Sequence, residues 1–391
     1  MLELIAFASV GFLVLVWLAY PLLIAAFSKR PPSALFRSRA TEPAVSVIIA
    51  TRDDEEAVRD RVANCLESTY DLARLEIVIG VDARRGPRAA VDMTSRCCSD
   101  AFLGRCIVVG GDDPGGKAAT LNAAVRASHG EILVFTDTHQ RFDRDAIRQL
   151  VRSLQDPRVG ASSGSLELPR VSGGRSVIDR YWRMERWLRR CEARVHSCVG
   201  VTGAIWAMRR SLWSPLPADV ILDDVYTPMR LVLSGYRIAF VESAVAMETR
   251  SVGVRHEYRR KVRTLTGISQ LLVMLPALLV PKRNPIWAQF IFHKVLRLLT
   301  PYWVLAVAIW GAVLIGPWLA SHPEVVAAGV IPAMVACCYS GGRRALGRVG
   351  GVAFSVFMMQ AAVVVATVNG VRRRWDVWTD ASGIPDGELG S

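Results

Sequence analysis

Three long segments without a charged residue limit what this chain can fold into. They run from Leu4 to Phe27, from Leu298 to Ala320 and from Val349 to Val371. Each is long enough to cross a hydrocarbon core about 30 Å thick. Because they enclose a long charged stretch, we predict a soluble part held between membrane-spanning helices. The predicted divisions are an N-terminal transmembrane anchor at 1–28, a cytosolic domain at 40–260, interfacial amphipathic helices at 261–296, a transmembrane region of two or three spans at 297–371, and a polar tail at 372–391.

The first segment has the features of a retained anchor rather than of a secretory signal peptide. It lacks a basic n-region, its apolar stretch is too long, and no clean A-x-A site follows. Four basic residues come after it, at Lys29, Arg30, Arg37 and Arg39. The positive-inside rule places them in the cytoplasm, so we expect a multi-pass protein of the inner (plasma) membrane whose soluble domain is cytoplasmic.

The topology of the C-terminal region stays open. A fourth apolar run, from Val325 to Tyr339, contains Pro332 and either spans the membrane or re-enters it. The arginines at 343, 344 and 348 favour the cytoplasmic side, and so do those at 372–374. Four simple crossings cannot satisfy both groups.

Composition excludes some classes of partner. Apolar residues make up 51% of the 391 residues, the mean hydropathy is +0.27, and the net charge is +13. No basic patch interleaved with aromatic residues stands apart from the membrane segments, so we expect no nucleic-acid partner. Arginines close to the membrane and facing anionic lipid explain the excess charge. The eight cysteines show no C-x-x-C spacing, which is typical of reduced thiols in a cytosolic domain.

The first half of the soluble part alternates short β-branched runs with helical patterns. The predicted strands are VSVIIA at 45–50, LEIVIGVD at 75–82, RCIVVG at 105–110 and ILVFT at 132–136. Amphipathic stretches such as 55–68 and 118–127 separate them. This alternation predicts an α/β fold with a mostly parallel sheet and helices on both faces. Further along, the apolar stretch from Val262 to Val280 contains Arg263 and Pro276 and is predicted to lie along the membrane surface.

Acidic and hydroxyl side chains follow three of the predicted strands. Thr51, Asp53 and Asp54 come after the first, Asp82 ends the second, and Asp137 follows the fourth. Taken singly, such residues are more often helix caps or turn residues. Ligands bind at the carboxyl ends of parallel strands, so their coincidence there indicates a binding site.

Two further patterns suggest a phosphate and a metal. Lys117 follows Gly115 and Gly116 and opens a predicted helix, so its ammonium and the helix N-terminus both suit a phosphate. Asp137 and His139, two residues apart in an extended segment, project to the same side and can bind one divalent cation, Mg²⁺ or Mn²⁺. Asp223 and Asp224 begin another helical pattern, where spacing alone leaves two alternatives, a helix cap or a general base.

Nine motifs in a fixed order now point to a family. They are VSVIIATRDDEE, IVIGVD, GGKAATLN, EILVFTDTHQRFDRDA, YWRMERWLRR, GVTGAIWAMRRSLW, LDDVYTPM, SGYRI and RRKVR. From about Val45 to Pro301 the chain resembles the membrane-integrated family 2 glycosyltransferases, which include bacterial exopolysaccharide, chitooligosaccharide, cellulose and hyaluronan synthases.

The resemblance implies a GT-A fold of the Rossmann-like type and an inverting transfer from a nucleotide-sugar donor, a UDP-sugar, to a glycan or a lipid-linked acceptor. Asp224 would be the catalytic base. By the same resemblance the donor would be bound by Thr51, Asp53, Asp54, Asp82, Lys117, Asp137 and Arg263; the acceptor by Gly203, Ala204 and Asp223; and the metal by Asp137 and His139. Export or synthase proteins would be possible partners.

The chain departs from the family pattern at two places. His139 stands where the family has the second acid of its D-x-D motif. The Q-x-x-R-W motif keeps a cation at Arg263 but has Thr264 in place of tryptophan, which argues against processive synthesis.

Those departures leave room for a second class of function, a catalytically inactive scaffold that assists an active synthase. A transporter is disfavoured, because the apolar segments hold almost no ionisable residues.

Overall fold

The computed structural model describes residues 2–29, 42–86, 88–97, 105–168, 177–249, 254–325 and 357–375. The chain divides into two compact units. One, here called the sheet unit, consists of Ile24–Val252 and Gln270–Phe290, and the other, the helical unit, of Met1–Leu23, Gly253–Ser269 and Ile291–Ser391. All but the first residue of the predicted fourth apolar run, and most of the polar tail, lie outside the described residues.

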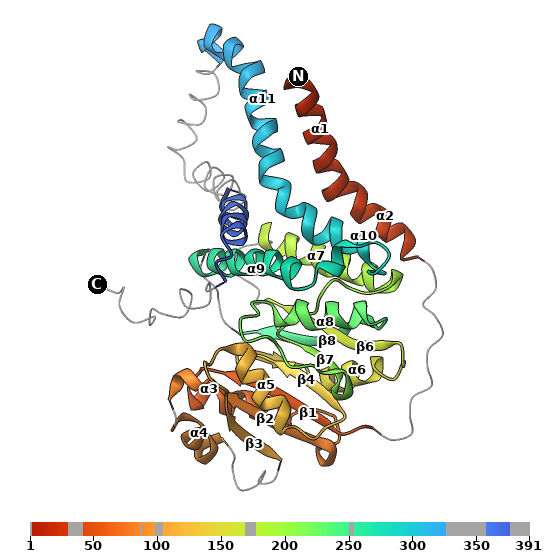
Figure 1. The fold of residues 1–391 in the computed structure, drawn as a ribbon, viewed down its shortest axis with the longest axis vertical. Helices are drawn as coiled ribbons and strands as arrows, with labels where there is room; N and C mark the ends of the chain where they lie inside the picture. Colours follow the sequence, from red (N-terminus) through yellow and green to blue (C-terminus); the bar gives the residue numbers. More distant parts are fainter. Residues whose placement is uncertain are drawn as a thin grey trace, which may run out of the picture. The chain divides into compact units, whose positions relative to one another are not determined.

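Within the described residues, one sheet of eight strands forms the sheet unit, in the order β3-β2-β1-β4-β7-β6-β8-β5 (Figure 1). The strands are β1 (Val45–Thr51), β2 (Leu75–Val81), β3 (Cys106–Gly110), β4 (Ile132–Thr136), β5 (Gln140–Phe142), β6 (Val159–Glu167), β7 (Trp206–Arg209) and β8 (Arg237–Glu248). The first four are paired with one another in parallel, in the order β3-β2-β1-β4, as predicted. Beyond β4 the sheet is mixed, because β7 is antiparallel to β4 and β6 while β8 is parallel to β6.

Helices cover both faces of this sheet, which confirms the predicted layers. On one face α3 (Glu55–Leu66), α4 (Ala89–Cys97) and α6 (Ala146–Ser153) share a core with alternate residues of the strands, including Ile79 and Val81. On the other face α5 (Lys117–Ala127) packs so closely that a Cβ at Gly80 would lie 2.8 Å from Thr120 Cγ2. Successive residues of a strand point to opposite faces, so the apolar runs of β1, β2 and β4 are buried from both sides.

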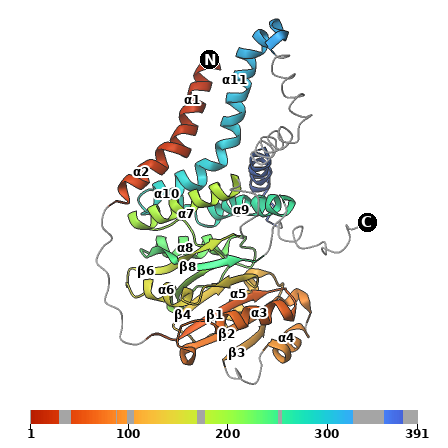
Figure 2. The same ribbon diagram turned by 180° about the vertical axis from the view of Figure 1, so that it is seen from behind.

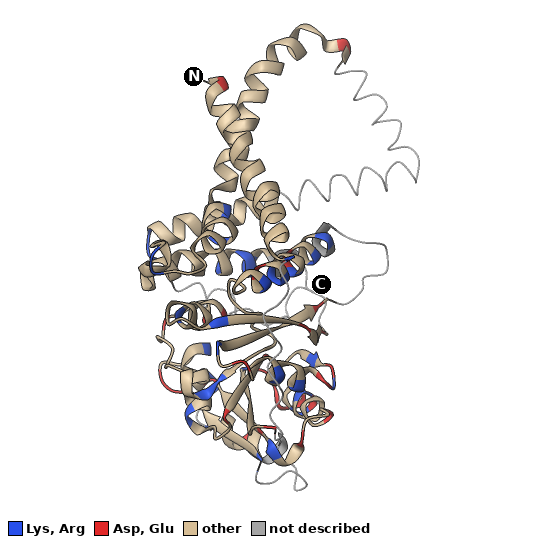
Figure 3. Cartoon of the chain, turned by 90° about the vertical axis from the view of Figure 1, so that its right-hand side faces the viewer, with Lys and Arg blue, Asp and Glu red and all other residues tan. Residues whose placement is uncertain are grey.

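In the part of the chain that the structure describes, two helices are long and apolar enough to cross a membrane by length and composition. The first runs from Leu2 to Phe27 through α1 (Leu2–Val14) and α2 (Tyr20–Phe27), and the second from Trp287 to Ser321 ends in α11 (Thr300–Ser321). Within the helical unit α1 and α11 lie side by side (Figure 2). Phe12 stacks on Trp303 with ring centroids 5.0 Å apart, and Trp17 Nε1 donates to Thr300 Oγ1 at 3.2 Å. Figure 3 shows how few charges these helices carry.

The stretch predicted as interfacial helices at 261–296 has different boundaries in the structure. Helix α9 (Val254–Met274) begins earlier and ends just before Pro276. Proline has no backbone N–H to donate to the preceding turn, so the helix does not continue through it. A short turn at Pro276–Leu279 follows, and α10 (Trp287–Phe290) then begins the helix that continues into α11 without a break at 296. Beyond these residues, 357–371 forms a shorter apolar helix inside the predicted last span.

Candidate active site at the strand ends

The parallel strands bring the predicted residues together at one edge of the sheet. β1 pairs with β2 on one side and with β4 on the other. Thr51 is the last residue of β1, Asp82 follows β2, and Asp137 follows β4. Asp53 and Asp54 lie just beyond Thr51, between β1 and α3.

Lys117 joins the carboxylates of two separate elements. Its Nζ lies 3.0 Å from Asp137 Oδ1 and 3.7 Å from Asp223 Oδ1. Burial alone would lower the pKa of Lys117, but Asp137, Asp223 and Asp224 outweigh burial and hold that pKa above its ordinary value. The lysine is therefore a fixed cation at the centre of a group of acids.

Asp224 lies against a glycine of the predicted acceptor segment. A Cβ added to Gly203 would be 3.1 Å from Asp224 Oδ2, and Val201 N donates to the Asp224 carbonyl at 2.8 Å. The neighbouring Ala204 is buried. Helix α8 (Asp223–Leu233) begins with both acids, but Leu222 occupies the N-cap position and no side chain caps the helix. The helix-cap alternative for Asp223 and Asp224 is therefore wrong, although two acids in the first turn still suit the helix dipole.

Asp82 is buried and bonded on both oxygens. Oδ1 accepts from Gly116 N and Arg84 N, each at 3.0 Å, and Oδ2 accepts from Arg52 Nε. Burial alone would raise the pKa of Asp82, and these bonds together lower it below its ordinary value. The carboxylate thus ties the end of β2 to the loop before α5, which explains the buried acid without a ligand. Its predicted contact with a nucleoside stays a prediction.

Sequence reasoning missed Arg52 and Arg84 as partners of Asp82. Arg52 directly follows β1, and Arg84 lies three residues after the end of β2. Their position at strand ends, which had pointed to the acids, could have pointed to these arginines as well. Arg84 also lies over the Gly115–Gly116 loop, because its Nε donates to the Pro114 carbonyl at 3.3 Å. This edge of the sheet therefore carries Arg52 and Arg84 in addition to Lys117.

The first strand end forms a second polar cluster. Thr51 Oγ1 accepts from Asp53 N at 2.9 Å and from Thr138 Oγ1 at 3.0 Å. Asp54 caps α3 by accepting from Ala57 N at 2.9 Å, as expected for an acid before a helix. The backbone beside Asp137 is thereby tied to the end of β1.

The two predicted metal ligands have other neighbours in the structure. His139 Nε2 lies 2.9 Å from Asp53 Oδ1, although the two groups are not aligned as a hydrogen bond, and Asp137 contacts Lys117. Among the described residues no group of three or more His, Cys, Asp or Glu side chains could hold a metal ion. One carboxylate and one imidazole suffice only where a ligand supplies the remaining oxygens, as nucleotide phosphates do for Mg²⁺.

Arg263 lies in α9 in the part that belongs to the helical unit. Its predicted contact with a donor diphosphate stays a prediction.

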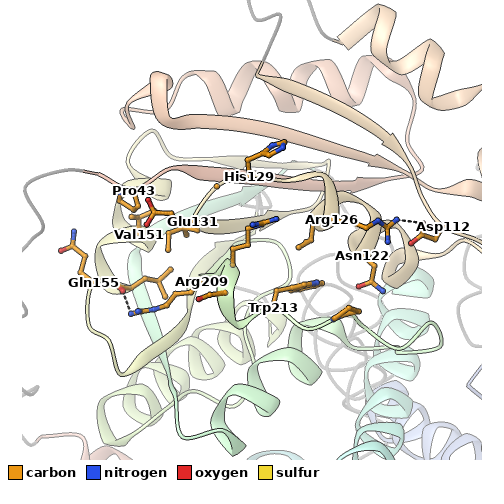
Figure 4. Close-up of a pocket in the computed structure, with 17 residues that line it drawn as sticks. Pro43, Asp112, Asn122, Arg126, His129, Glu131, Val151, Gln155, Arg209 and Trp213 are labelled. Carbon is orange, nitrogen blue, oxygen red and sulfur yellow. Dashed lines mark hydrogen bonds and ion pairs between the residues drawn. The ribbon is translucent and has the colours of Figure 1, made fainter.

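A cavity of 750 Å³ lies at the opposite, amino-terminal edge of the sheet (Figure 4). It is lined by residues such as Pro43 before β1, Arg126 at the end of α5 and Trp213. None of the predicted site residues lines it. The chemistry-bearing residues lie at the other edge, at the carboxyl ends of the strands, where open α/β sheets bind their ligands.

Comparisons with known proteins agree with this arrangement. A family model described as glycosyltransferase like family 2 matches residues 43–267. An N-acetylglucosaminyltransferase of Azorhizobium caulinodans is 25% identical over 238 residues, which cover 56% of this chain and 58% of the relative. A poly-β-1,6-N-acetyl-D-glucosamine synthase of Staphylococcus aureus is 22% identical over 274 residues, covering 67% of this chain and 63% of the relative. The chain thus spans about six tenths of the length of these curated relatives.

A solved structure covers far more of the chain. The mannosyltransferase of Pyrobaculum calidifontis, in complex with GDP-Man and Mn²⁺, superposes with a TM-score of 0.70 at 23% identity, covering 96% of this chain and all of that one. The likeness identifies the fold as GT-A. Since the family model matches more than half of the chain, this protein belongs to glycosyltransferase family 2.

Proposed function

We propose that this protein is an inverting, membrane-bound glycosyltransferase that moves a sugar from a UDP-sugar to a glycan acceptor in the synthesis of a cell-surface or extracellular polysaccharide. The observation that carries the proposal is the position of Lys117, whose ammonium contacts Asp137 on the strand side and Asp223 on the helix side. A cation held there can meet a diphosphate, and Asp224 stands beside it as a base.

The reaction follows from the charges of these residues. Asp224 accepts the proton of the acceptor hydroxyl while that oxygen bonds to the anomeric carbon. The bond from that carbon to the diphosphate oxygen breaks in the same step, and configuration inverts. Lys117 stabilises the negative charge that develops on the leaving diphosphate. No covalent enzyme intermediate is needed.

The side chains of Asp137 and His139 supply part of the ligands that a divalent cation, Mg²⁺ or Mn²⁺, requires. Asp137 and His139 would hold it together with phosphate oxygens of the donor, and it would supply charge neutralisation for the leaving group. The solved mannosyltransferase contains Mn²⁺, which supports the choice of Mn²⁺ for the first assays.

The sugar and its nucleotide are the least constrained part. The relatives named for N-acetylglucosamine support a UDP-N-acetylhexosamine donor, and the GDP-Man of the structural neighbour supports GDP-mannose as the competitor. A donor screen that follows release of UDP or GDP, with and without Mn²⁺, separates them. Asp137→Ala should abolish release, whereas Asp219→Ala, an exposed acid outside the strand ends, should not. Full release by the Asp137→Ala variant contradicts the proposed site.

The acceptor has two alternatives, a glycan or a polyprenyl phosphate or glycolipid in the inner leaflet. Membranes incubated with the labelled donor yield a polymer in the first case and a single organic-extractable adduct in the second.

The position of His139 in place of an acid motivates one other function, an inactive scaffold for a synthase. In cells, Asp224→Asn then leaves the glycan unchanged while deletion of the chain abolishes it. Loss of the glycan in both strains supports the enzyme.

A further inference from the structure

Two side chains of α3 hold both ends of the turn that carries Asp137 and His139. Arg61 Nη2 donates to Thr136 Oγ1 at 3.0 Å, just before the turn. Asn64 Oδ1 accepts from Phe142 N at 2.7 Å, and Asn64 Nδ2 donates to the Phe142 carbonyl at 3.1 Å, just after it. The two side chains are also bonded to each other, from Arg61 Nη1 to Asn64 Oδ1. Arg61 and Asn64, about one helical turn apart, are therefore hydrogen-bonded to the last residues of β4 and β5.

The guanidinium of Arg61 is an unusual group for this place. The residue is 2% exposed, and its guanidinium carbon lies 4.0 Å from the ring centroid of Phe142. Burial lowers the pKa of Arg61, while negative groups that include Asp137 act in the other direction. Among the described residues no carboxylate lies within ion-pair distance of it. Burying an unpaired ion costs several kcal/mol, so an apolar residue would stabilise α3 more simply.

Other groups also hold the turn, among them Lys117, whose Nζ donates to Asp137 Oδ1 at 3.0 Å. Thr136 Oγ1, which accepts from Arg61, donates in turn to the Asp137 carbonyl at 3.1 Å. Thr138 and His139 are held through Thr51 and Thr249, the latter donating to the His139 carbonyl at 2.7 Å. Arg61 is thus two hydrogen bonds from the backbone of Asp137.

We propose that Arg61 and Asn64 are positioning residues that preorganise the Asp137–His139 turn for the nucleotide-sugar donor and its cation. The inference rests on the proposed function, because it presumes that Asp137 meets the donor. Neither residue contacts the donor. Reaction rates are sensitive to placement, since an error of about 1 Å at a binding group can cost about a hundredfold.

The test compares Arg61→Met, Arg61→Lys and Asn64→Ala with Arg209→Met in the full chain reconstituted in lipid nanodiscs. Arg209 is the matched control, because its guanidinium also donates hydrogen bonds inside the sheet unit, to the carbonyls of Leu154 and Asp156 at 2.6 Å, but at the opposite edge of the sheet. The measurements are thermal midpoint, donor KM and kcat, the Mn²⁺ concentration for half activation, and hydrogen exchange of the peptide over 132–142.

Arg61→Met is expected to raise donor KM and the half-activating Mn²⁺ concentration at least tenfold and to speed exchange at residues 136–142. Arg61→Lys, which keeps the charge and the aliphatic stem, should recover part of both. Asn64→Ala should speed exchange at Phe142, whose N–H it releases. Arg209→Met should lower the thermal midpoint with KM within twofold and exchange at 136–142 unchanged.

Two results overturn the inference. One is a donor KM within twofold of wild type in Arg61→Met and Asn64→Ala; the other is faster exchange at 136–142 in the Arg209 variant to the same extent. Hydrogen exchange is measured without the sugar donor. It therefore tests whether Arg61 and Asn64 hold the turn even where the wild-type protein transfers no sugar. Failure of the proposed function and failure of this inference are thereby distinguished.

Discussion

Lys117 and Asp223 come from different helices, yet Nζ of the first lies 3.7 Å from Oδ1 of the second. The lysine opens α5 beside the strand ends, and the acid opens α8. Because Asp224 is the next residue, the lysine links the predicted donor side to the predicted base. Any ligand that draws the ammonium toward a phosphate changes the charge that the acid pair experiences.

Replacing Lys117 with Met should weaken binding of the sugar donor more than binding of the acceptor. A hydrogen bond to a charged group contributes about 1.5–3 kcal/mol, so donor KM should rise about tenfold to a hundredfold. Lys117→Arg keeps the charge and should recover part of the loss. Steady-state kinetics with the donor varied at fixed acceptor measure this, and an unchanged donor KM in Lys117→Met contradicts the phosphate role.

Replacing Asp224 with Asn should remove the base while keeping the shape of the side chain. General base catalysis contributes about 10²–10⁴-fold, so kcat should fall within that range while donor KM stays within a few-fold. Asp219→Asn is the control, because Asp219 is an exposed acid in the segment before α8. Equal activity of the two variants assigns the base to another residue.

Gly115→Ala should destabilise the protein by more than Gly86→Ala. Both glycines have positive φ, at 82° and 94°, where backbone strain from a Cβ costs about 1–3 kcal/mol. At Gly115 the new Cβ would also lie 2.7 Å from Asp82 Oδ1, whereas at Gly86 nothing lies within 4 Å. Chemical unfolding of the two variants isolates the steric part, and equal losses would show that the loop shifts freely.

Asp82 should make stability fall in acid. The pKa of Asp82 is lower in the folded protein than the ordinary value of about 3.9. The carboxylate therefore adds to the free energy of unfolding above the ordinary pKa, and this stabilisation is lost as pH falls through the folded pKa. Asp82→Asn lacks this proton linkage. Unfolding measured from pH 6 to pH 3 should therefore show the gap between wild type and variant narrowing below about pH 4; a constant gap assigns the acid sensitivity elsewhere.

The turn at Pro276–Leu279 should contact lipid headgroups, as the predicted interfacial location requires. Leu279 and Val280 are exposed at 43% and 41%, and Lys282 and Arg283 follow them. An environment-sensitive fluorophore on Leu279→Cys should shift to the blue and be quenched by nitroxide lipids in anionic nanodiscs. The same label on Val91→Cys, an exposed valine of α4, should do neither. Equal spectra at both sites contradict an interfacial turn.

The parallel half of the fold was predictable because each of its strands and helices shows a clear pattern within its own segment of the sequence. Continuous apolar runs such as those of β1 and β4 require burial from both faces, and the intervening amphipathic patterns supply the covering helices. The mixed half was not predictable in this way. β7 has four residues and β5 three, so neither offers a periodic pattern, and their pairing partners come from distant parts of the chain.

The position of the candidate site was predictable for the same reason, since strand ends of a parallel sheet meet at one edge. The partners of each side chain were not. Nothing in the sequence indicates that Asp82 binds Gly116 N or that His139 lies beside Asp53, because such contacts depend on how loops from separate strands meet. The helix-cap alternative for Asp223 failed on a boundary of one residue, at Leu222.

The three residues Asp137, Thr138 and His139 join β4 to β5, although three other strands separate these two in the order of the sheet. Both strands are fixed by their pairing, and the connection has no spare length. Most loops of a domain tolerate the gain or loss of a residue, but this one cannot change length without moving a strand. We therefore expect this connection to tolerate insertions and deletions poorly for a loop, and a library of single-residue indels would register that intolerance without an assay of sugar transfer.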